Sequence, residues 1–77
     1  MAKKREDLSE GYIKIVEIMK RRRKELRFSR EFVAQSIGCY IETIETFERL
    51  ETRINSDYLI KLVNLYGWKF VLAELSI

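Results

Sequence analysis

The 77-residue chain contains no proline, no histidine and a single cysteine, Cys39. A lone cysteine excludes an internal disulfide, and without histidine the usual ligand set of a zinc site is missing. No apolar run approaches the roughly 18 residues that a membrane-spanning helix needs, and the basic start of the chain is not followed by the apolar stretch of a secretory signal. We therefore expect a cytoplasmic protein with no metal, no cofactor and no membrane association.

The residue patterns of the common enzyme classes are also missing. The sequence has no glycine-rich phosphate loop, no nucleophile placed beside a base and no spacing typical of metal ligands. Cys39 directly follows Gly38, and we interpret it as a small residue that fills a turn rather than as a redox group. The sequence therefore predicts a protein that is not an enzyme.

Because the chain has no proline, its three glycines, Gly11, Gly38 and Gly67, are the residues that most strongly interrupt regular secondary structure. Hydrophobic residues make up 47% of the chain and charged residues 35%, which is typical of globular proteins. With no repeat, low-complexity tract or linker, the simplest interpretation is one small domain with a thin core.

Basic residues are unevenly placed along the chain. The formal net charge is only +3, but seven of the fifteen basic residues lie in the segment KRRRKELRFSR, residues 20–30, and a second basic cluster occupies residues 3–5. A concentrated basic stripe is typical of proteins with a polyanionic partner. The alternative is a solvated helix face that is balanced by Glu17, Glu25 and Glu31.

Apolar spacing predicts four helices, over residues 12–26, 29–37, about 40–47 and 58–66. Ser29 is placed to cap the second helix through its hydroxyl group, and Gly38 can adopt the left-handed conformation that ends it. Asn55, Ser56 and Asp57 form a cap cluster before the fourth helix.

The last segment, WKFVLAELSI, has apolar residues in alternation at Trp68, Phe70 and Leu72. This pattern predicts a β-strand. Because a lone strand is not stable in water, such a strand needs a partner strand from a second copy of the chain. The alternative is a short fifth helix that packs on the first.

The segment from Phe28 to Glu48 combines two short apolar-periodic stretches around Gly38. Helices this short are marginal in water by themselves, but two of them joined by a turn can bury their apolar stripes against a third helix and present the second one outward. The segment therefore predicts a helix-turn-helix. Its apolar positions are Val33, Ala34, Ile37, Ile44 and Phe47.

Four motifs, taken in order, resemble the phage repressor and Cro family, also called the xenobiotic-response-element type. They are Arg23, the VAQSIG segment at residues 33–38, the TIETFE segment at 43–48 and the LIKLVNLYG segment at 59–67, and together they span about Met19 to Trp68. The resemblance implies an all-α fold of four or five helices. It divides the chain into a flexible basic arm (1–11), a helix-turn-helix DNA-binding domain (12–67) and a dimerisation segment (68–77).

The chain departs from the family pattern after the third helix. The family usually has glycine where Leu50 stands and proline where Ile54 stands. Leucine adopts the left-handed conformation poorly, so we expect the third helix to continue through Arg49 to Glu51.

The resemblance implies that the third helix enters the major groove of double-stranded DNA with its first residues at the base edges. Ile41 would contact a thymine methyl group, and Glu42 would accept a hydrogen bond from a cytosine amino group. The base contacts are expected from Tyr40, Ile41, Glu42, Glu45 and Thr46. The phosphate contacts are expected from Arg30, Tyr40, Arg49 and Arg53.

Two further sets of residues have expected roles. Arg23 and Glu48 are expected to form a partly buried ion pair between the first and third helices. The exposed apolar residues of the last segment are expected to form a homodimer, whose two third helices would read half-sites about 34 Å apart on a palindromic operator. These dimerisation residues are Trp68, Phe70, Leu72 and Leu75.

The sequence therefore predicts a sequence-specific DNA-binding regulator, a repressor rather than an activator. The acidic character of the third helix is an argument against it, since Glu42 and Glu45 would face phosphates. The alternative is an antitoxin or adaptor of the same fold whose main role is to bind a partner protein such as a toxin.

Overall fold

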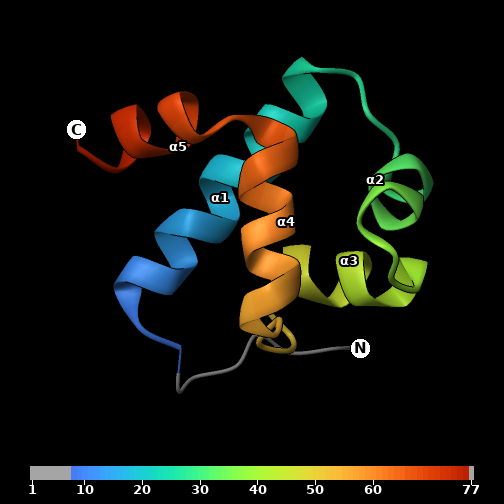
Figure 1. Ribbon diagram of the computed structural model, residues 1–77. Helices are drawn as coiled ribbons and strands as arrows, with labels where there is room; N and C mark the ends of the chain where they lie inside the picture. Colours follow the sequence, from blue (N-terminus) through green and yellow to red (C-terminus); the bar gives the residue numbers. More distant parts are fainter. Residues whose placement is uncertain (1–7, 77) are drawn as a thin grey trace.

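The computed structural model describes residues 8–76, which fold into five α-helices with no strand among them. The helices are α1 (Glu10–Glu25), α2 (Arg30–Ile37), α3 (Ile41–Glu48), α4 (Ser56–Tyr66) and α5 (Trp68–Leu75). α1 packs against α3, α4 and α5, and α2 packs against α3 and α4. In Figure 1, α2 and α3 lie on one side of α1 and α4, and α5 lies on the other. None of these helices has both the length and the apolar character to cross a membrane.

All five helices contribute side chains to one hydrophobic core. Removing a large apolar side chain from water contributes roughly 1.5–3 kcal/mol, so these residues hold together helices that are too short to be stable alone. The largest fully buried side chains are Val16, Met19, Val33, Ile44, Phe47 and Leu62.

The predicted start and end of α2 are confirmed. The Ser29 hydroxyl accepts a hydrogen bond from the backbone N–H of Phe32 at 2.9 Å, which satisfies one of the free donors of the first turn. Gly38 ends the helix at φ 76°. The predicted cap of α4 is confirmed at Asn55, whose side chain accepts from the N–H of Tyr58 at 2.9 Å.

The first residues of the folded domain lie earlier than the sequence predicted. Of the expected arm at 1–11, residues 1–7 lie outside the described part of the chain. Leu8 is buried in the core, and Ser9 caps α1 by accepting from the N–H of Tyr12 at 3.1 Å. Residues 8–11 therefore belong to the domain, and α1 begins at Glu10.

The prediction of a C-terminal strand is wrong, because Trp68–Leu75 forms the helix α5. This helix packs on α1, as the alternative interpretation expected. The segment contains, besides the alternating Trp68 and Phe70, apolar residues at helical spacing. Val71 is buried in the core, and Phe70 and Leu75 are partly buried against it. This one-sided burial stabilises a helix rather than a strand.

The expected extension of the third helix to Glu51 is also wrong. α3 ends at Glu48, and Leu50 adopts the left-handed conformation at φ 62°. The N–H of Glu51 bonds the carbonyl of Thr46 at 2.9 Å, and the N–H of Leu50 bonds the carbonyl of Phe47 at 3.1 Å. This is a Schellman motif that is usually built with glycine. The Leu50 side chain is buried, and its burial offsets a conformational cost of roughly 1–2 kcal/mol.

Candidate nucleic-acid interface

A three-residue turn, residues 38–40, joins α2 to α3. The backbone N–H groups of Gly38 and Cys39 both bond the carbonyl of Ala34, at 2.9 and 3.0 Å. Tyr40 then precedes α3 without a side-chain capping bond, and its side chain is 81% exposed. The turn therefore leaves the beginning of α3 open to solvent.

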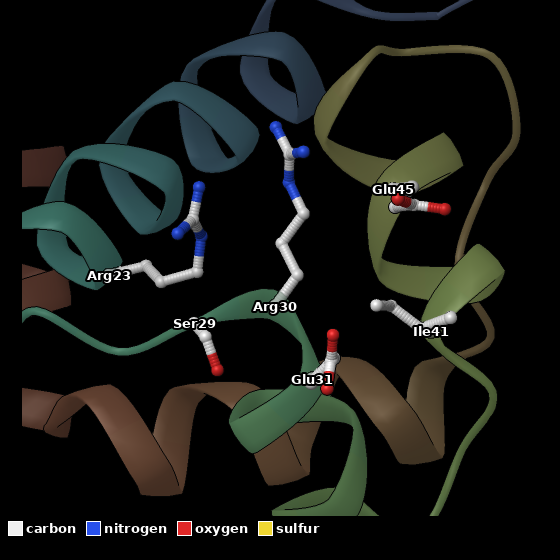
Figure 2. Close-up of a pocket in the computed structure, with 6 residues that line it drawn as sticks. All are labelled: Arg23, Ser29, Arg30, Glu31, Ile41 and Glu45. Atoms are coloured by element: carbon white, nitrogen blue, oxygen red, sulfur yellow. The ribbon is translucent and has the colours of Figure 1, made fainter.

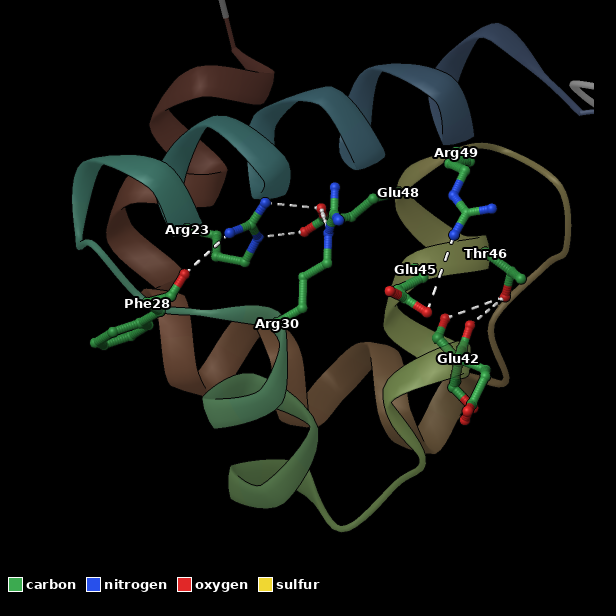
Figure 3. Close-up of polar contacts among 9 residues, drawn as sticks. Arg23, Phe28, Arg30, Glu42, Glu45, Thr46, Glu48 and Arg49 are labelled. Carbon is green, nitrogen blue, oxygen red and sulfur yellow. Dashed lines mark hydrogen bonds and ion pairs between the residues drawn. The ribbon is translucent and has the colours of Figure 1, made fainter.

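The end of α3 is anchored by a buried ion cluster around Glu48 (Figure 3). Nε of Arg23 donates to Oε2 of Glu48 at 2.6 Å, and Nη2 donates to Oε1 at 3.0 Å. Nε of Arg30 donates to the same Oε1 at 3.2 Å. Nη1 of Arg23 donates to the carbonyl of Phe28 at 2.9 Å. The structure thus brings together the expected pair and adds Arg30 to it; we call Glu48, Arg23 and Arg30 the Glu48 cluster.

The Glu48 carboxylate raises the pKa values of Arg23 and Tyr66. The hydrogen bond from Arg23 to Glu48 raises the pKa of the guanidinium, although burial acts in the opposite direction. Burial raises the pKa of the Tyr66 phenol, and the nearby Glu48 carboxylate raises it further. The cluster therefore favours the charged form of Arg23 and the neutral form of Tyr66, and its ion pairs join α1 and α2 to α3.

A hollow of about 420 Å³ opens between the start of α2 and the first half of α3. Figure 2 shows Arg30 extending from α2 past this hollow, with Ile41 and Glu45 of α3 opposite. Arg30 bonds only through Nε within residues 8–76, so its two terminal nitrogens can bind an anion. Ile41 is only partly exposed and packs against the core. The lining residues are Arg23, Ser29, Arg30, Glu31, Ile41 and Glu45.

Arg49 lies at the far end of α3 between two carboxylates. Its Nη2 is 3.9 Å from Oε1 of Glu45, and its Nη1 is 3.4 Å from Oε2 of Glu51. Figure 3 shows the contact with Glu45. We call these three residues the Arg49 cluster. This cluster was not predicted from the sequence, although the spacing of four residues from Glu45 to Arg49 is a recognisable signal. The contact with Glu51 depends on the turn at Leu50.

The expected base-contact residues at α3 differ in whether their side chains already form hydrogen bonds or ion pairs. Within residues 8–76 the Glu42 carboxylate has no hydrogen bond or ion pair, and the side chain is exposed. The Thr46 hydroxyl donates to the carbonyl of Glu42 at 2.8 Å and accepts from the Thr52 hydroxyl at 3.0 Å. The side chains of Tyr40 and Glu42 can therefore contact a partner without disturbing another contact, whereas Glu45 is paired with Arg49 and the Thr46 hydroxyl already donates its hydrogen.

Arg53 lies apart from the Arg49 cluster, in the segment between α3 and α4. It is exposed, and its guanidinium carbon is 5.3 Å from the ring centre of Tyr12. Such a cation–π contact leaves the outer nitrogens able to bind an anion.

The basic run at residues 20–30 does not form one continuous surface. Consecutive helical residues point in directions about 100° apart, so Arg21, Arg22 and Arg23 reach different neighbours. Arg21 forms an ion pair with Glu74 of α5. Nε of Arg22 donates to the carbonyl of Tyr66 at 3.1 Å. With Arg30, which bonds Glu48, four of the seven basic residues therefore hold helices together. The sequence predicted this role only for Arg23.

The C-terminal apolar residues divide into two pairs. Phe70 and Leu75 pack against the core of their own chain, and the Phe70 ring lies 4.3 Å from the guanidinium carbon of Arg22. Trp68 and Leu72 are 48% and 55% exposed. Nε1 of Trp68 donates to Oδ1 of Asn64. Only Trp68 and Leu72 of the four expected dimerisation residues present a large apolar surface to solvent.

Comparison of the chain with protein-family models, with curated proteins and with solved structures finds no match in any of the three.

Proposed function

We propose that this protein is a sequence-specific DNA-binding regulator that acts as a repressor, with α2 and α3 forming a helix-turn-helix. The observation that carries the proposal is the unequal anchoring of α3. Its end is held by the buried Glu48 cluster, while its beginning, at Tyr40 and Glu42, is exposed to solvent. A helix that reads the major groove needs this combination of a rigid support and free N-terminal side chains.

The arrangement divides the α3 face into base contacts and phosphate contacts. Tyr40 and Glu42 would reach base edges, and the Glu42 carboxylate would accept a hydrogen bond from a cytosine amino group. Arg30 would bind a backbone phosphate through its terminal nitrogens, and Arg53 would bind a second one. Phosphate contacts position the protein, and base contacts specify the sequence.

The pairing of three glutamates weakens the argument against DNA binding. Of the four glutamates at 42–51, Glu45 and Glu51 contact Arg49, and Glu48 contacts Arg23 and Arg30. Glu42 alone remains as an unpaired acid of this group. One unpaired carboxylate can act selectively, because it repels the acceptor edges of the wrong bases and pairs with cytosine.

A homodimer would follow from Trp68 and Leu72, the large apolar side chains exposed on α5. Two copies related by a two-fold axis would present two α3 helices to half-sites about 34 Å apart. The operator would then be a palindrome.

The test is selection of bound duplexes from a random pool at a low and a high salt concentration, with the wild type and Glu42→Gln. We expect the wild type to enrich a palindrome and Glu42→Gln to change the preference at one base pair of each half-site, worth about 1–3 kcal/mol. Binding should weaken as salt rises, because phosphate contacts release counterions.

Glu31→Gln is the matched control for Glu42→Gln, because it makes the same change of charge on α2. It should raise the affinity for all duplexes alike and leave the preferred sequence unchanged. Enrichment of no sequence would contradict the proposal, and a single enriched half-site would contradict the dimer.

A second candidate is an antitoxin or adaptor whose main partner is a protein. It is favoured by the exposed Trp68 and Leu72, because exposed apolar side chains that lie together often mark association surfaces. Failure to enrich any duplex, together with a toxin gene beside this one, would favour the second candidate.

A further inference from the structure

The Arg49 guanidinium contacts carboxylates through both of its terminal nitrogens. Nη2 faces Glu45 and Nη1 faces Glu51, at 3.9 and 3.4 Å. One cation between two carboxylates leaves the cluster with a net charge of −1. Arg49 was expected to bind a DNA phosphate, yet in the free protein its terminal nitrogens are directed toward acidic side chains.

The two carboxylates are placed by different parts of the fold. Glu45 lies on α3, one turn before Arg49, which directly follows the helix, and this spacing favours an ion pair. Glu51 is brought back to Arg49 by the left-handed turn at Leu50, where its own N–H bonds the carbonyl of Thr46. The Glu51 side chain is only 15% exposed, so the turn holds this carboxylate close to the protein surface.

We propose that Glu45 and Glu51 compete with DNA phosphate for Arg49 and thereby lower the affinity of the α3 face for duplex DNA. The proposal rests on the proposed function. A phosphate that binds the exposed guanidinium has to share it with both carboxylates or displace them, and in either case the carboxylates lie close to the phosphate backbone. Glu45 and Glu51 are thus affinity-determining residues that need not contact DNA.

The expected effect is a gain of affinity when either carboxylate is neutralised. Exposed ion pairs contribute little, so Glu45→Gln and Glu51→Gln should each bind a random-sequence duplex roughly two- to five-fold more tightly at low salt. The double variant should bind more tightly than either single one. The gain should shrink as salt is added, because screening weakens both ion pairs and phosphate contacts.

Removal of any negative charge near DNA also reduces repulsion, and a double-mutant cycle separates this general effect from competition for Arg49. Glu45→Gln and Glu51→Gln are measured with Arg49 and again with Arg49→Ala, by fluorescence anisotropy on the same random-sequence duplex. Glu31→Gln gives the size of the general effect, and far-UV circular dichroism checks that every variant is folded.

The cycle has distinct outcomes. A gain that falls to the Glu31→Gln level when Arg49 is absent supports the competition. An equal gain with and without Arg49 overturns it and leaves DNA binding intact. Absence of duplex binding by every folded variant overturns the proposed function and the competition together.

Discussion

The Glu48 cluster and the Arg49 cluster contain the same chemical groups in opposite numbers. In the Glu48 cluster one carboxylate is shared by two guanidinium groups, and the Glu48 side chain is 2% exposed. In the Arg49 cluster one guanidinium is shared by two carboxylates, and its side chain is 52% exposed. The central residues of the two clusters, Glu48 and Arg49, are adjacent at the C-terminal end of α3.

Burial, rather than residue type, determines how much an ion pair contributes to the stability of the fold. Two charges interact far more strongly in a protein interior than at a surface screened by water. Loss of one partner in the interior leaves a charge that water cannot solvate. The Glu48 cluster is therefore expected to support the fold, and the Arg49 cluster is expected to contribute little to its stability.

The largest expected difference between the clusters is in the free energy of unfolding. Glu48→Ala removes the shared carboxylate and leaves Arg23 buried without its partner, so we expect a loss of about 3–5 kcal/mol. Glu45→Ala removes a carboxylate of the exposed cluster and should cost less than about 1 kcal/mol. Urea unfolding of the two variants measures the difference.

A double replacement tests the origin of this loss. Arg23→Met combined with Glu48→Leu removes both buried charges and keeps their volume, so it should be less destabilising than Glu48→Ala alone. A double variant that is as unstable as Glu48→Ala would show that the loss does not come from an unpaired buried charge. Equal losses for Glu48→Ala and Glu45→Ala would contradict the comparison itself.

The sequence was informative where local chemistry dominates. Ser29, Gly38 and Asn55 predicted helix ends correctly, because capping groups and left-handed glycine act on their own neighbours. The expected pairing of Arg23 with Glu48 corresponds to a contact in the structure. Its third member, Arg30, was assigned to phosphate instead, because nothing local indicates that its Nε faces Glu48.

The sequence was misleading where packing overrides a local preference. Leu50 adopts a conformation that leucine disfavours because its side chain gains a buried position, and burial depends on the whole fold. Trp68 and Phe70 alternate like strand residues, but the segment packs on α1 as a helix and buries Val71 in the core. The Arg49 cluster follows from the turn at Leu50, so the error in that turn also concealed Glu51.

Tyr66, which lies close to Glu48, is expected to change the free energy of unfolding by an amount between those of the two clusters. Burial and the Glu48 carboxylate raise the pKa of its phenol, so the folded protein holds this proton more tightly than the unfolded chain does. The resulting stability is complete below the ordinary tyrosine pKa near 10 and is lost as the pH rises above it. The free energy of unfolding should fall by roughly 1 kcal/mol per pH unit above that value.

Tyr66→Phe keeps the buried ring and removes the proton. The difference in unfolding free energy between the wild type and Tyr66→Phe should stay constant from pH 7 to about pH 9 and shift in favour of Tyr66→Phe above pH 10. Tyr40→Phe, at an exposed position, is the matched control and should follow the wild type. Parallel curves for the wild type and Tyr66→Phe would show that folding does not raise the pKa of this phenol.

The smallest expected effect on stability belongs to Arg49→Ala. Its guanidinium is 52% exposed and both of its ion pairs are long, so the free energy of unfolding should change by less than about 1 kcal/mol. Arg30→Ala should cost more than Arg49→Ala, because it removes a hydrogen bond to the buried Glu48 carboxylate. Urea unfolding at low and high salt checks both variants, and salt should reduce only the small Arg49 effect. A loss above about 2 kcal/mol for Arg49→Ala would show that the Arg49 cluster, like the Glu48 cluster, stabilises the fold.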